Sequence, residues 1–153
     1  GVQTCALPIY FDSVVVGLYH ELDYQALEDC MRAVRNGARL VGSNADNSYP
    51  TPDGPVPGGG AVLAAIAVAS GVEPVVCGKP HEPMARLVRA SLGNVDPAAL
   101  AVVGDKVSTD GLFAEVLGCR FGFVLSGVGS PHEAPEGCVV ADDLSSMVDL
   151  LLG

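Results

Sequence analysis

Short apolar segments alternate with helical segments along most of this chain, and this alternation is the feature that most limits its fold. Residues 13–17 (SVVVG) form an apolar run that ends in glycine, as buried strands often do. Strands that alternate with helices at this spacing predict a mainly parallel sheet covered on both faces, a doubly wound α/β fold. The other predicted strands are residues 38–42, 74–77, 100–103, 121–125 and 138–140, and the predicted helices lie between Asp23 and Gly37 and over residues 61–70, 83–92, 111–117 and 144–152.

Two segments break this pattern. Residues 44–60 (NADNSYPTPDGPVPGGG) are dense in Pro, Gly, Asn and Asp and predict a long loop. The PGGG at its end could cradle a phosphate, but it follows a loop and lacks a GK[ST], so close packing is favoured. Residues 1–9 (GVQTCALPI) show no periodic pattern and resemble a translated sequencing adapter. We predict that this opening segment is non-native and exclude it from the fold.

Composition excludes several classes of function. The formal net charge is −10, and the eight Lys and Arg residues form no run, so nucleic acid is excluded as a partner. The longest apolar run, residues 61–69, is far shorter than the ~20 residues that span a bilayer, and no segment resembles a signal peptide. The five cysteines are widely spaced without a CxxC pair and are predicted to be buried reduced thiols. A cytoplasmic protein without a membrane partner is the resulting prediction.

Two charged motifs follow predicted strands. In GKP, residues 78–80, the ammonium of Lys79 could balance phosphate charge at the sheet edge, or it could be an exposed turn lysine. In GDKVSTD, residues 104–110, Asp105 and Asp110 stand five residues apart and could face one spot. Mg²⁺ takes such oxygen ligands while keeping several waters, and Asp105 would be its direct ligand. The alternative is that Asp110 caps a helix and Asp105 only accepts backbone N–H bonds.

The order of these motifs resembles a known superfamily. A strand-end lysine about 25 residues before a strand-end GDxxxxD is similar to the third and fourth motifs of the haloacid dehalogenase superfamily of phosphohydrolases. Over roughly three quarters of the chain, VVVGL, RLVGSNAD, PTPDG, PGGG, SGVEP, VVCGKP, VVGDKVSTD and VLSGV resemble the NagD-like subclass in matching order. Members of this subclass include p-nitrophenyl phosphatases and phosphoglycolate or nucleotide phosphatases.

The resemblance implies a role for each matching position. Lys79 matches the lysine that neutralises the nucleophile and the phosphoryl oxygens, Asp105 the aspartate that completes the Mg²⁺ shell, and Asp110 the second acidic residue. The implied activity is Mg²⁺-dependent hydrolysis of a small phosphorylated metabolite through an aspartyl phosphate. Candidate substrate-binding residues are Lys106, Val107, Ser108 and Thr109 in the loop beside the phosphate, and Asn44 and Asp46, which match a TNxD-like signature of the lid.

The chain departs from the family at its first motif. That motif, DxDG, supplies the attacking aspartate, yet no Asp-x-Asp occurs in these 153 residues, and the strand-end Thr or Ser of the second motif is missing too. We therefore expect a C-terminal fragment that is itself inactive. Residues 10–75 would be the later half of an α/β lid, which could also form a homo-oligomer, and residues 76–153 the later half of a Rossmann-like core. The alternative is a non-catalytic α/β module that binds an anion or a metal.

Overall fold

The computed structural model describes residues 11–153, which form two compact units. The N-terminal unit ends at Gly78 and the C-terminal unit begins at Lys79, a few residues beyond the predicted division between residues 75 and 76. That the two units are part of a lid and part of a phosphatase core stays a prediction. The predicted non-native segment, residues 1–9, lies outside the described residues.

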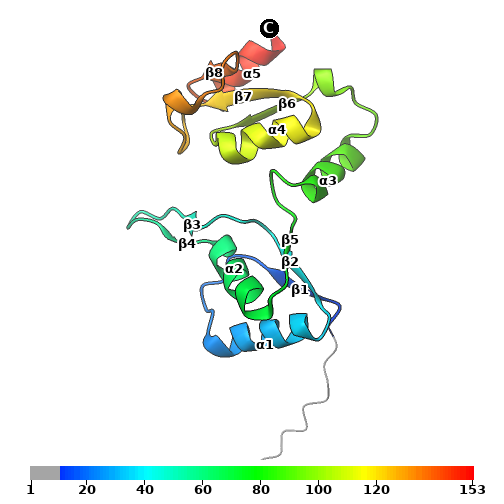
Figure 1. Ribbon diagram of the computed structural model, residues 1–153. Helices are drawn as coiled ribbons and strands as arrows, with labels where there is room; N and C mark the ends of the chain where they lie inside the picture. The colour runs from blue at the N-terminus through cyan, green and yellow to red at the C-terminus, as the bar shows by residue number, and fades with distance from the viewer. Residues whose placement is uncertain (1–10) are drawn as a thin grey trace, which may run out of the picture. The chain divides into compact units, whose positions relative to one another are not determined.

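The N-terminal unit is built on a parallel sheet with strand order β1-β2-β5. Its strands are β1 (Ser13–Val16), β2 (Arg39–Gly42) and β5 (Val75–Val76). Helices α1 (Tyr24–Arg35) and α2 (Gly59–Ser70) pack against each other and against one face of the sheet (Figure 1). On the opposite face Val15 is 73% exposed, because successive strand residues point to opposite sides. The described residues thus cover one face of this sheet, whereas the sequence predicted two covered faces.

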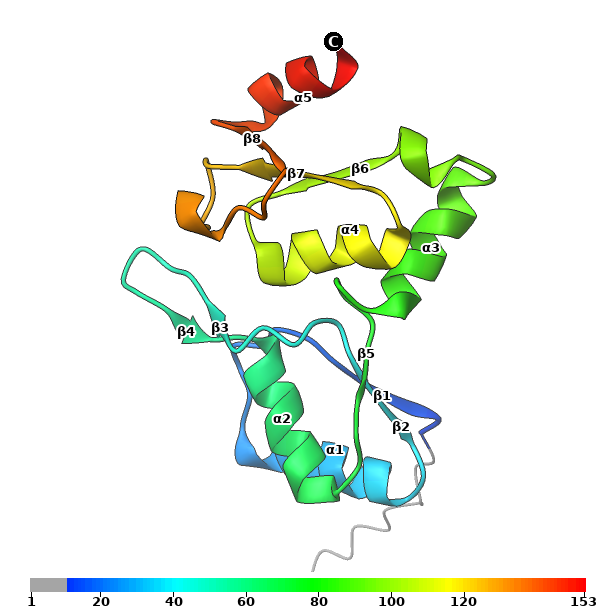
Figure 2. The ribbon, with the colours of Figure 1, turned by 45° about the horizontal axis from the view of Figure 1, so that its top comes forward.

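The predicted long loop contains a small β-hairpin, so the expectation of a loop throughout residues 44–60 was wrong. Strands β3 (Ser48–Tyr49) and β4 (Val56–Pro57) pair antiparallel, and the hairpin extends beyond α2 in Figure 2. Thr51 closes the turn by donating its hydroxyl to the carbonyl of Gly54 at 2.6 Å. Strands this short show no alternation that a sequence pattern could reveal.

The three glycines at the start of α2, residues 58–60, pack closely against residues 44–48, as predicted. The Gly60 N–H donates to the carbonyl of Asp46 at 2.9 Å, and a Cβ at Gly60 would overlap the backbone of Ala45. The Gly60 N–H, in the first turn of the helix, therefore already has a protein carbonyl as its acceptor. This contact favours close packing over a phosphate cradle at this helix end.

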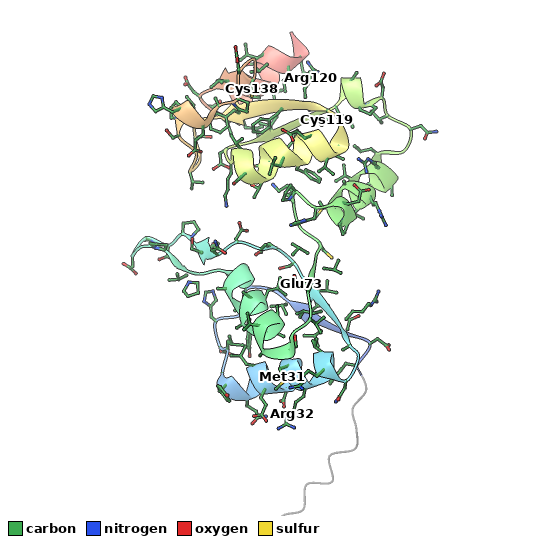
Figure 3. All side chains as sticks on the ribbon, viewed as in Figure 1. Met31, Arg32, Glu73, Cys119, Arg120 and Cys138 are labelled. Atoms are coloured by element: carbon green, nitrogen blue, oxygen red, sulfur yellow. The ribbon has the colours of Figure 1, made fainter. Side chains whose placement is uncertain are left out.

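Several predicted helix ends are confirmed. Asp23 caps α1, accepting the Ala26 N–H at 2.8 Å, and Gly71 ends α2 in the left-handed conformation at φ 74°. On the solvent side of α1, Arg32 points away from the sheet in Figure 3 and pairs with Glu28 one turn earlier. These local signals fix the start of α1 and the end of α2.

The C-terminal unit is a second parallel sheet, with strand order β6-β7-β8. Helices on both faces cover it, as predicted: Phe113 of α4 and Ala85 of α3 lie in the core on one face, and Met147 of α5 lies in the core on the other. The bounds are β6 (Ala101–Gly104), β7 (Arg120–Val124), β8 (Val139–Ala141), α3 (Glu82–Leu92), α4 (Leu112–Leu117) and α5 (Leu144–Leu152), with a π-helical turn (Val107–Gly111) and 3₁₀ turns (Pro97–Ala99 and Pro131–Glu133).

The predicted reduced thiols are free but only partly buried. Burial raises the pKa of Cys30, Cys119 and Cys138, and for Cys30 the neighbouring Asp29 adds to the rise. Cys5 lies outside the described part of the chain. No helix within residues 11–153 has the length and apolar character needed to cross a membrane.

Candidate active site

The predicted charged residues lie where β6 and β7 end in the C-terminal unit. Gly104, the last residue of β6, pairs with Phe123 near the end of β7. Because the two strands are parallel, the segments that follow them leave the sheet at the same edge. These segments are residues 105–111 and 125–130.

Asp110 is buried, with 5% of its surface exposed, and pairs with Lys79, 31 residues earlier. Lys79 Nζ donates to Asp110 Oδ1 at 2.6 Å, and the Lys106 backbone N–H donates to Asp110 Oδ2 at 3.2 Å. The Lys79 side chain is 50% exposed, so its ammonium is held by the carboxylate on one side and open on the other. Lys79 is thus an exposed turn residue, as the alternative expected, and also the ion-pair partner of Asp110.

The position of the Asp110 carboxylate depends on Gly104. A Cβ on Gly104 would overlap the carboxylate, so only glycine lets the side chain lie over the end of β6. Helix α4 has Gly111 as its N-cap residue and no side chain that caps it. Asp110 therefore does not cap this helix, and that alternative is wrong: its carboxylate binds Lys79 and the Lys106 backbone instead.

Asp105 turns toward the segment that follows β7. Its Oδ2 accepts the Val128 N–H at 2.6 Å, which supports in part the expectation that Asp105 accepts backbone N–H bonds. Within residues 11–153, Oδ1 has no hydrogen-bond or ion-pair partner. One oxygen of the carboxylate is thus held and the other remains able to bind a ligand.

The donor set at this edge fits a hard divalent cation that keeps most of its waters. Both oxygens of Asp110 are engaged, whereas Asp105 offers one oxygen. The described residues contain no cluster of three or more His, Cys, Asp and Glu side chains that could hold a metal. Mg²⁺ is commonly held by one or two carboxylates plus water and substrate phosphate, which is compatible with a single ligand here.

Residues 106–109 form the tight turn between Asp105 and Asp110. The N–H groups of Thr109 and Asp110 donate to the Lys106 carbonyl at 3.1 and 2.7 Å, and the Thr109 hydroxyl lies 3.4 Å from the same oxygen. Ser108 and Lys106 are exposed, whereas Val107 is partly buried. Of the predicted substrate-binding residues in this turn, Ser108 and Lys106 present polar side chains to solvent.

Asn44 and Asp46 belong to the N-terminal unit, where both take part in local hydrogen bonds that shape the backbone. Asn44 Oδ1 accepts the Asp46 N–H at 3.2 Å, forming a local turn, and the Asp46 carbonyl accepts the N–H of Gly60. Their predicted role in substrate binding stays a prediction.

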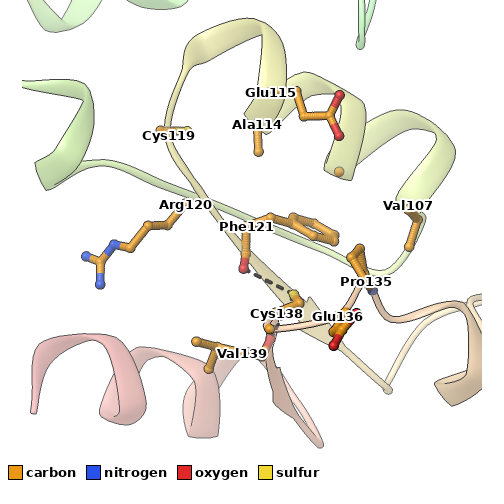
Figure 4. A pocket seen from close by; sticks show the side chains of 12 residues that line it. Val107, Ala114, Glu115, Cys119, Arg120, Phe121, Pro135, Glu136, Cys138 and Val139 are labelled. Atoms are coloured by element: carbon orange, nitrogen blue, oxygen red, sulfur yellow. Dashed lines mark hydrogen bonds between the residues drawn. The ribbon is translucent and has the colours of Figure 1, made fainter.

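A pocket of about 330 Å³ opens on the face of the C-terminal sheet that carries α4 (Figure 4). The labelled Cys138 points toward β7, where its thiol donates to the Phe121 carbonyl at 3.2 Å, drawn as a dashed line. Glu115 and Arg120 bring opposite charges to an otherwise apolar lining. Of the predicted site residues, only Val107 lines this pocket.

Sequence reasoning assigned no role to the loop after β7, residues 126–129 (SGVG). Besides the Val128 N–H, it contains Gly127, where a Cβ would overlap the Asp105 carboxylate, and Gly129, where a Cβ would overlap the Asp105 carbonyl. Two glycines directly after a strand at the same edge as GDKVSTD are the signal that could have revealed this loop.

Comparison with known proteins identifies relatives of both units. Residues 76–147 match a family model described as HAD-hydrolase-like. The acid sugar phosphatase of Staphylococcus saprophyticus is 39% identical over 101 residues, which are 66% of this chain and 39% of that protein. Its counterpart in Staphylococcus aureus is 37% identical over the same length. The chain thus spans about two fifths of the length of these curated relatives.

Solved structures resemble nearly the whole chain. A hypothetical protein of Pyrococcus horikoshii has a TM-score of 0.83 and 37% identity, covering 92% of this chain and 54% of the other. The p-nitrophenyl phosphatase of Archaeoglobus fulgidus has a TM-score of 0.81 and 31% identity, covering 91% and 56%. The glycerol phosphate phosphatase of Mycobacterium tuberculosis, in complex with magnesium, has a TM-score of 0.77 and 34% identity, covering 89% and 42%.

Proposed function

The chain belongs to the haloacid dehalogenase superfamily of hydrolases, in its NagD-like subclass, and on this basis we propose that it carries the metal- and phosphate-binding part of a phosphatase. The observation that carries the proposal is the Lys79–Asp110 ion pair beside Asp105, at one edge of a parallel sheet. The half-exposed cation of Lys79 and the uncommitted oxygen of Asp105 support this proposal.

Lys79 is the group we assign to the phosphoryl oxygens. Asp110 holds its ammonium in place from the buried side, so the lysine needs no reorganisation when an anion arrives on the exposed side. Charge that is oriented before the reaction stabilises a transition state more than charge that must turn toward it. The chain's net charge of −10 makes such a local cation necessary for an anionic substrate.

Asp105 is the residue we assign to the metal, through the oxygen that Val128 does not hold. When bound, Mg²⁺ would supply Lewis-acid polarisation of a phosphoryl oxygen and would template the substrate. We assign the Ser108 hydroxyl and the N–H groups of Val107 and Ser108 to the phosphate, because the N–H groups of Lys106 and Thr109 already donate to Asp110 and to the Lys106 carbonyl. The attacking carboxylate has to come from outside these residues, since they contain no Asp-x-Asp.

We further propose a sugar phosphate as the substrate class. The relatives named acid sugar phosphatase and the magnesium complex of a glycerol phosphate phosphatase support a small, polar phosphate monoester. The N-terminal unit, with Asn44 and Asp46, would then be the lid that contacts the organic part of the substrate. A second candidate, non-catalytic binding of phosphate or metal, is favoured by the absence of Asp-x-Asp.

The binding part of the proposal can be tested on the chain itself. We expect inorganic phosphate with Mg²⁺ to shift the amide resonances of residues 105–110, and Lys79→Met to abolish this shift. Arg120→Met is the matched control. It also removes one positive charge, but at the N-terminal end of β7, whereas the candidate site lies where β6 and β7 end. Equal phosphate binding by the Lys79→Met and unsubstituted chains would contradict the proposal.

Catalysis is tested in the gene product that contains this chain. There, Lys79→Met should lower kcat/KM for sugar phosphates by roughly 10²-fold or more, as removal of one charge-stabilising group usually does. Arg120→Met should leave it unchanged. A gene product that binds phosphate but hydrolyses neither sugar phosphates nor p-nitrophenyl phosphate would favour the second candidate.

A further inference from the structure

The loop Ser126–Gly129 contacts Asp105 through backbone atoms. The Val128 N–H donates to Asp105 Oδ2 at 2.6 Å, a short bond to an acceptor 23 residues earlier in the chain. Hydrogen bonds from a backbone N–H to an ionised carboxylate are shorter and stronger than neutral ones. The Val128 side chain is 73% exposed, so its identity contributes nothing visible to this contact.

Two glycines bring the loop this close. A Cβ on Gly127 would overlap the Asp105 carboxylate, and a Cβ on Gly129 would overlap the Asp105 carbonyl and approach the ring of Phe123 at 2.8 Å. Gly127 has no positive φ, so the missing side chain is required here for space rather than for backbone conformation. The loop therefore fits around one orientation of Asp105.

We propose that the loop Ser126–Gly129 is a positioning element that decides which carboxylate oxygen of Asp105 faces the metal. Holding Oδ2 with the Val128 N–H stops rotation of the carboxylate and leaves Oδ1 as the ligand. This inference rests on the proposed function, in which Asp105 is the direct metal ligand. Groups that orient a metal ligand commonly change metal affinity 10–100-fold when they are removed.

Three substitutions separate the backbone contact from side-chain effects. Val128→Pro removes the N–H, whereas Val128→Ala keeps it and is the matched control. Gly127→Ala places a methyl group where the carboxylate lies and should turn the Asp105 side chain away. Because the carboxylate is the flexible end of a partly buried side chain, the unit should stay folded, which unchanged amide shifts of Phe123 and Met147 would verify.

The readout is Mn²⁺ as a paramagnetic probe added to the ¹⁵N-labelled chain. We expect Mn²⁺ to broaden the amides of Gly104, Lys106 and Gly127, with an apparent affinity that falls at least ~10-fold in Gly127→Ala and Val128→Pro. In Val128→Ala it should stay within about twofold of the unsubstituted chain. Asp105→Asn should abolish the broadening, and Asp105→Ala, which has no side-chain acceptor, should speed hydrogen exchange of the Val128 amide.

The outcomes distinguish this inference from the function beneath it. The positioning role would be overturned if Gly127→Ala and Val128→Pro both kept the Mn²⁺ affinity while Asp105→Asn no longer bound Mn²⁺. Asp105 would then remain the metal ligand. Broadening that persists in Asp105→Asn would overturn the metal assignment and the inference together. An exchange rate of the Val128 amide that Asp105→Ala does not change would show that the contact is absent in solution, because alanine has no side-chain acceptor.

Discussion

Replacing Lys79 by methionine removes the cation from a carboxylate that the fold keeps away from water. The Asp110 side chain is only 7% exposed and would retain one hydrogen bond, from the Lys106 N–H at 3.2 Å. Breaking a buried ion pair from one side typically costs 3–5 kcal/mol because a buried charge is left unpaired. Since the Lys79 side chain is 50% exposed, water can partly replace it, and we expect a cost of about 2–3 kcal/mol.

Replacing the other partner should cost less, because the two ends of the pair differ in exposure. In Asp110→Asn the lysine is already half exposed and regains water, and the amide oxygen can still accept the Lys106 N–H. We expect a loss of about 1.5 kcal/mol, the low end for one hydrogen bond to a charged group. The double variant Lys79→Met/Asp110→Asn should lose less than the sum of the single variants, with a coupling energy of about 1–2 kcal/mol.

The assay is urea unfolding of the C-terminal unit, followed at the amide of Phe123, whose side chain is fully buried. The free energy of unfolding then comes from linear extrapolation. Glu115→Gln is the matched control for Asp110→Asn, since it makes the same charge change at an exposed position of α4 and should shift the midpoint little. Equal losses for Lys79→Met and Asp110→Asn would refute the reasoning that burial of the carboxylate sets the cost.

Three further predictions concern the rest of the C-terminal unit. Asp143→Ala should fray the start of α5, which faster hydrogen exchange of the Ser146 amide would show. Because the bond from Ser146 lowers the pKa of Asp143, the cap of the unsubstituted chain is present above the ordinary pKa of about 3.9 and is lost as pH falls through the lower folded value. An exchange rate of the Ser146 amide with the same pH dependence in the Ala variant would contradict this. Gly122→Ala would place a Cβ 2.6 Å from Met147 Sδ in the core and should lower the free energy of unfolding in urea by about 1–3 kcal/mol. An unchanged free energy of unfolding would show that the core can expand around the methyl group. Cys138 should react with iodoacetamide more slowly than a small-molecule thiol at pH 8, since burial raises its pKa, and the rate should climb with pH; a rate equal to the free thiol's would count against this burial.

Local patterns in the sequence predicted most of the secondary structure. Asp23 and Gly71 mark helix ends that formed as expected, because capping and left-handed glycines act within one turn of chain. The β3–β4 hairpin was missed, since a strand of two residues carries no periodic signal. The π-helical turn Val107–Gly111 was also missed, because its geometry serves to bring Asp110 back over Gly104.

Local patterns in the sequence predicted only part of the candidate site. The placement of Lys79 and Asp105 after strands follows from the order of apolar runs along the chain. The partner of each side chain does not, because Lys79 meets Asp110 from 31 residues away and Asp105 meets Val128 from 23 residues away. No local pattern encodes pairs of this kind, so the sequence alone leaves open which partner Lys79 meets and whether Asp110 caps a helix.

For this protein, the sequence by itself determined the alternation of strands and helices, their caps, and the two charged motifs at strand ends, since these depend on neighbours a few residues apart. Only the tertiary structure decided that Asp110 is buried against Lys79 and that one Asp105 oxygen is held while the other stays available. The physical reason is that the parallel strands β6 and β7 bring segments distant in the chain to one sheet edge, where glycines 104 and 127 leave room for carboxylates that any other residue would displace. Lys79 follows a strand of the other sheet and joins this edge only through its side chain.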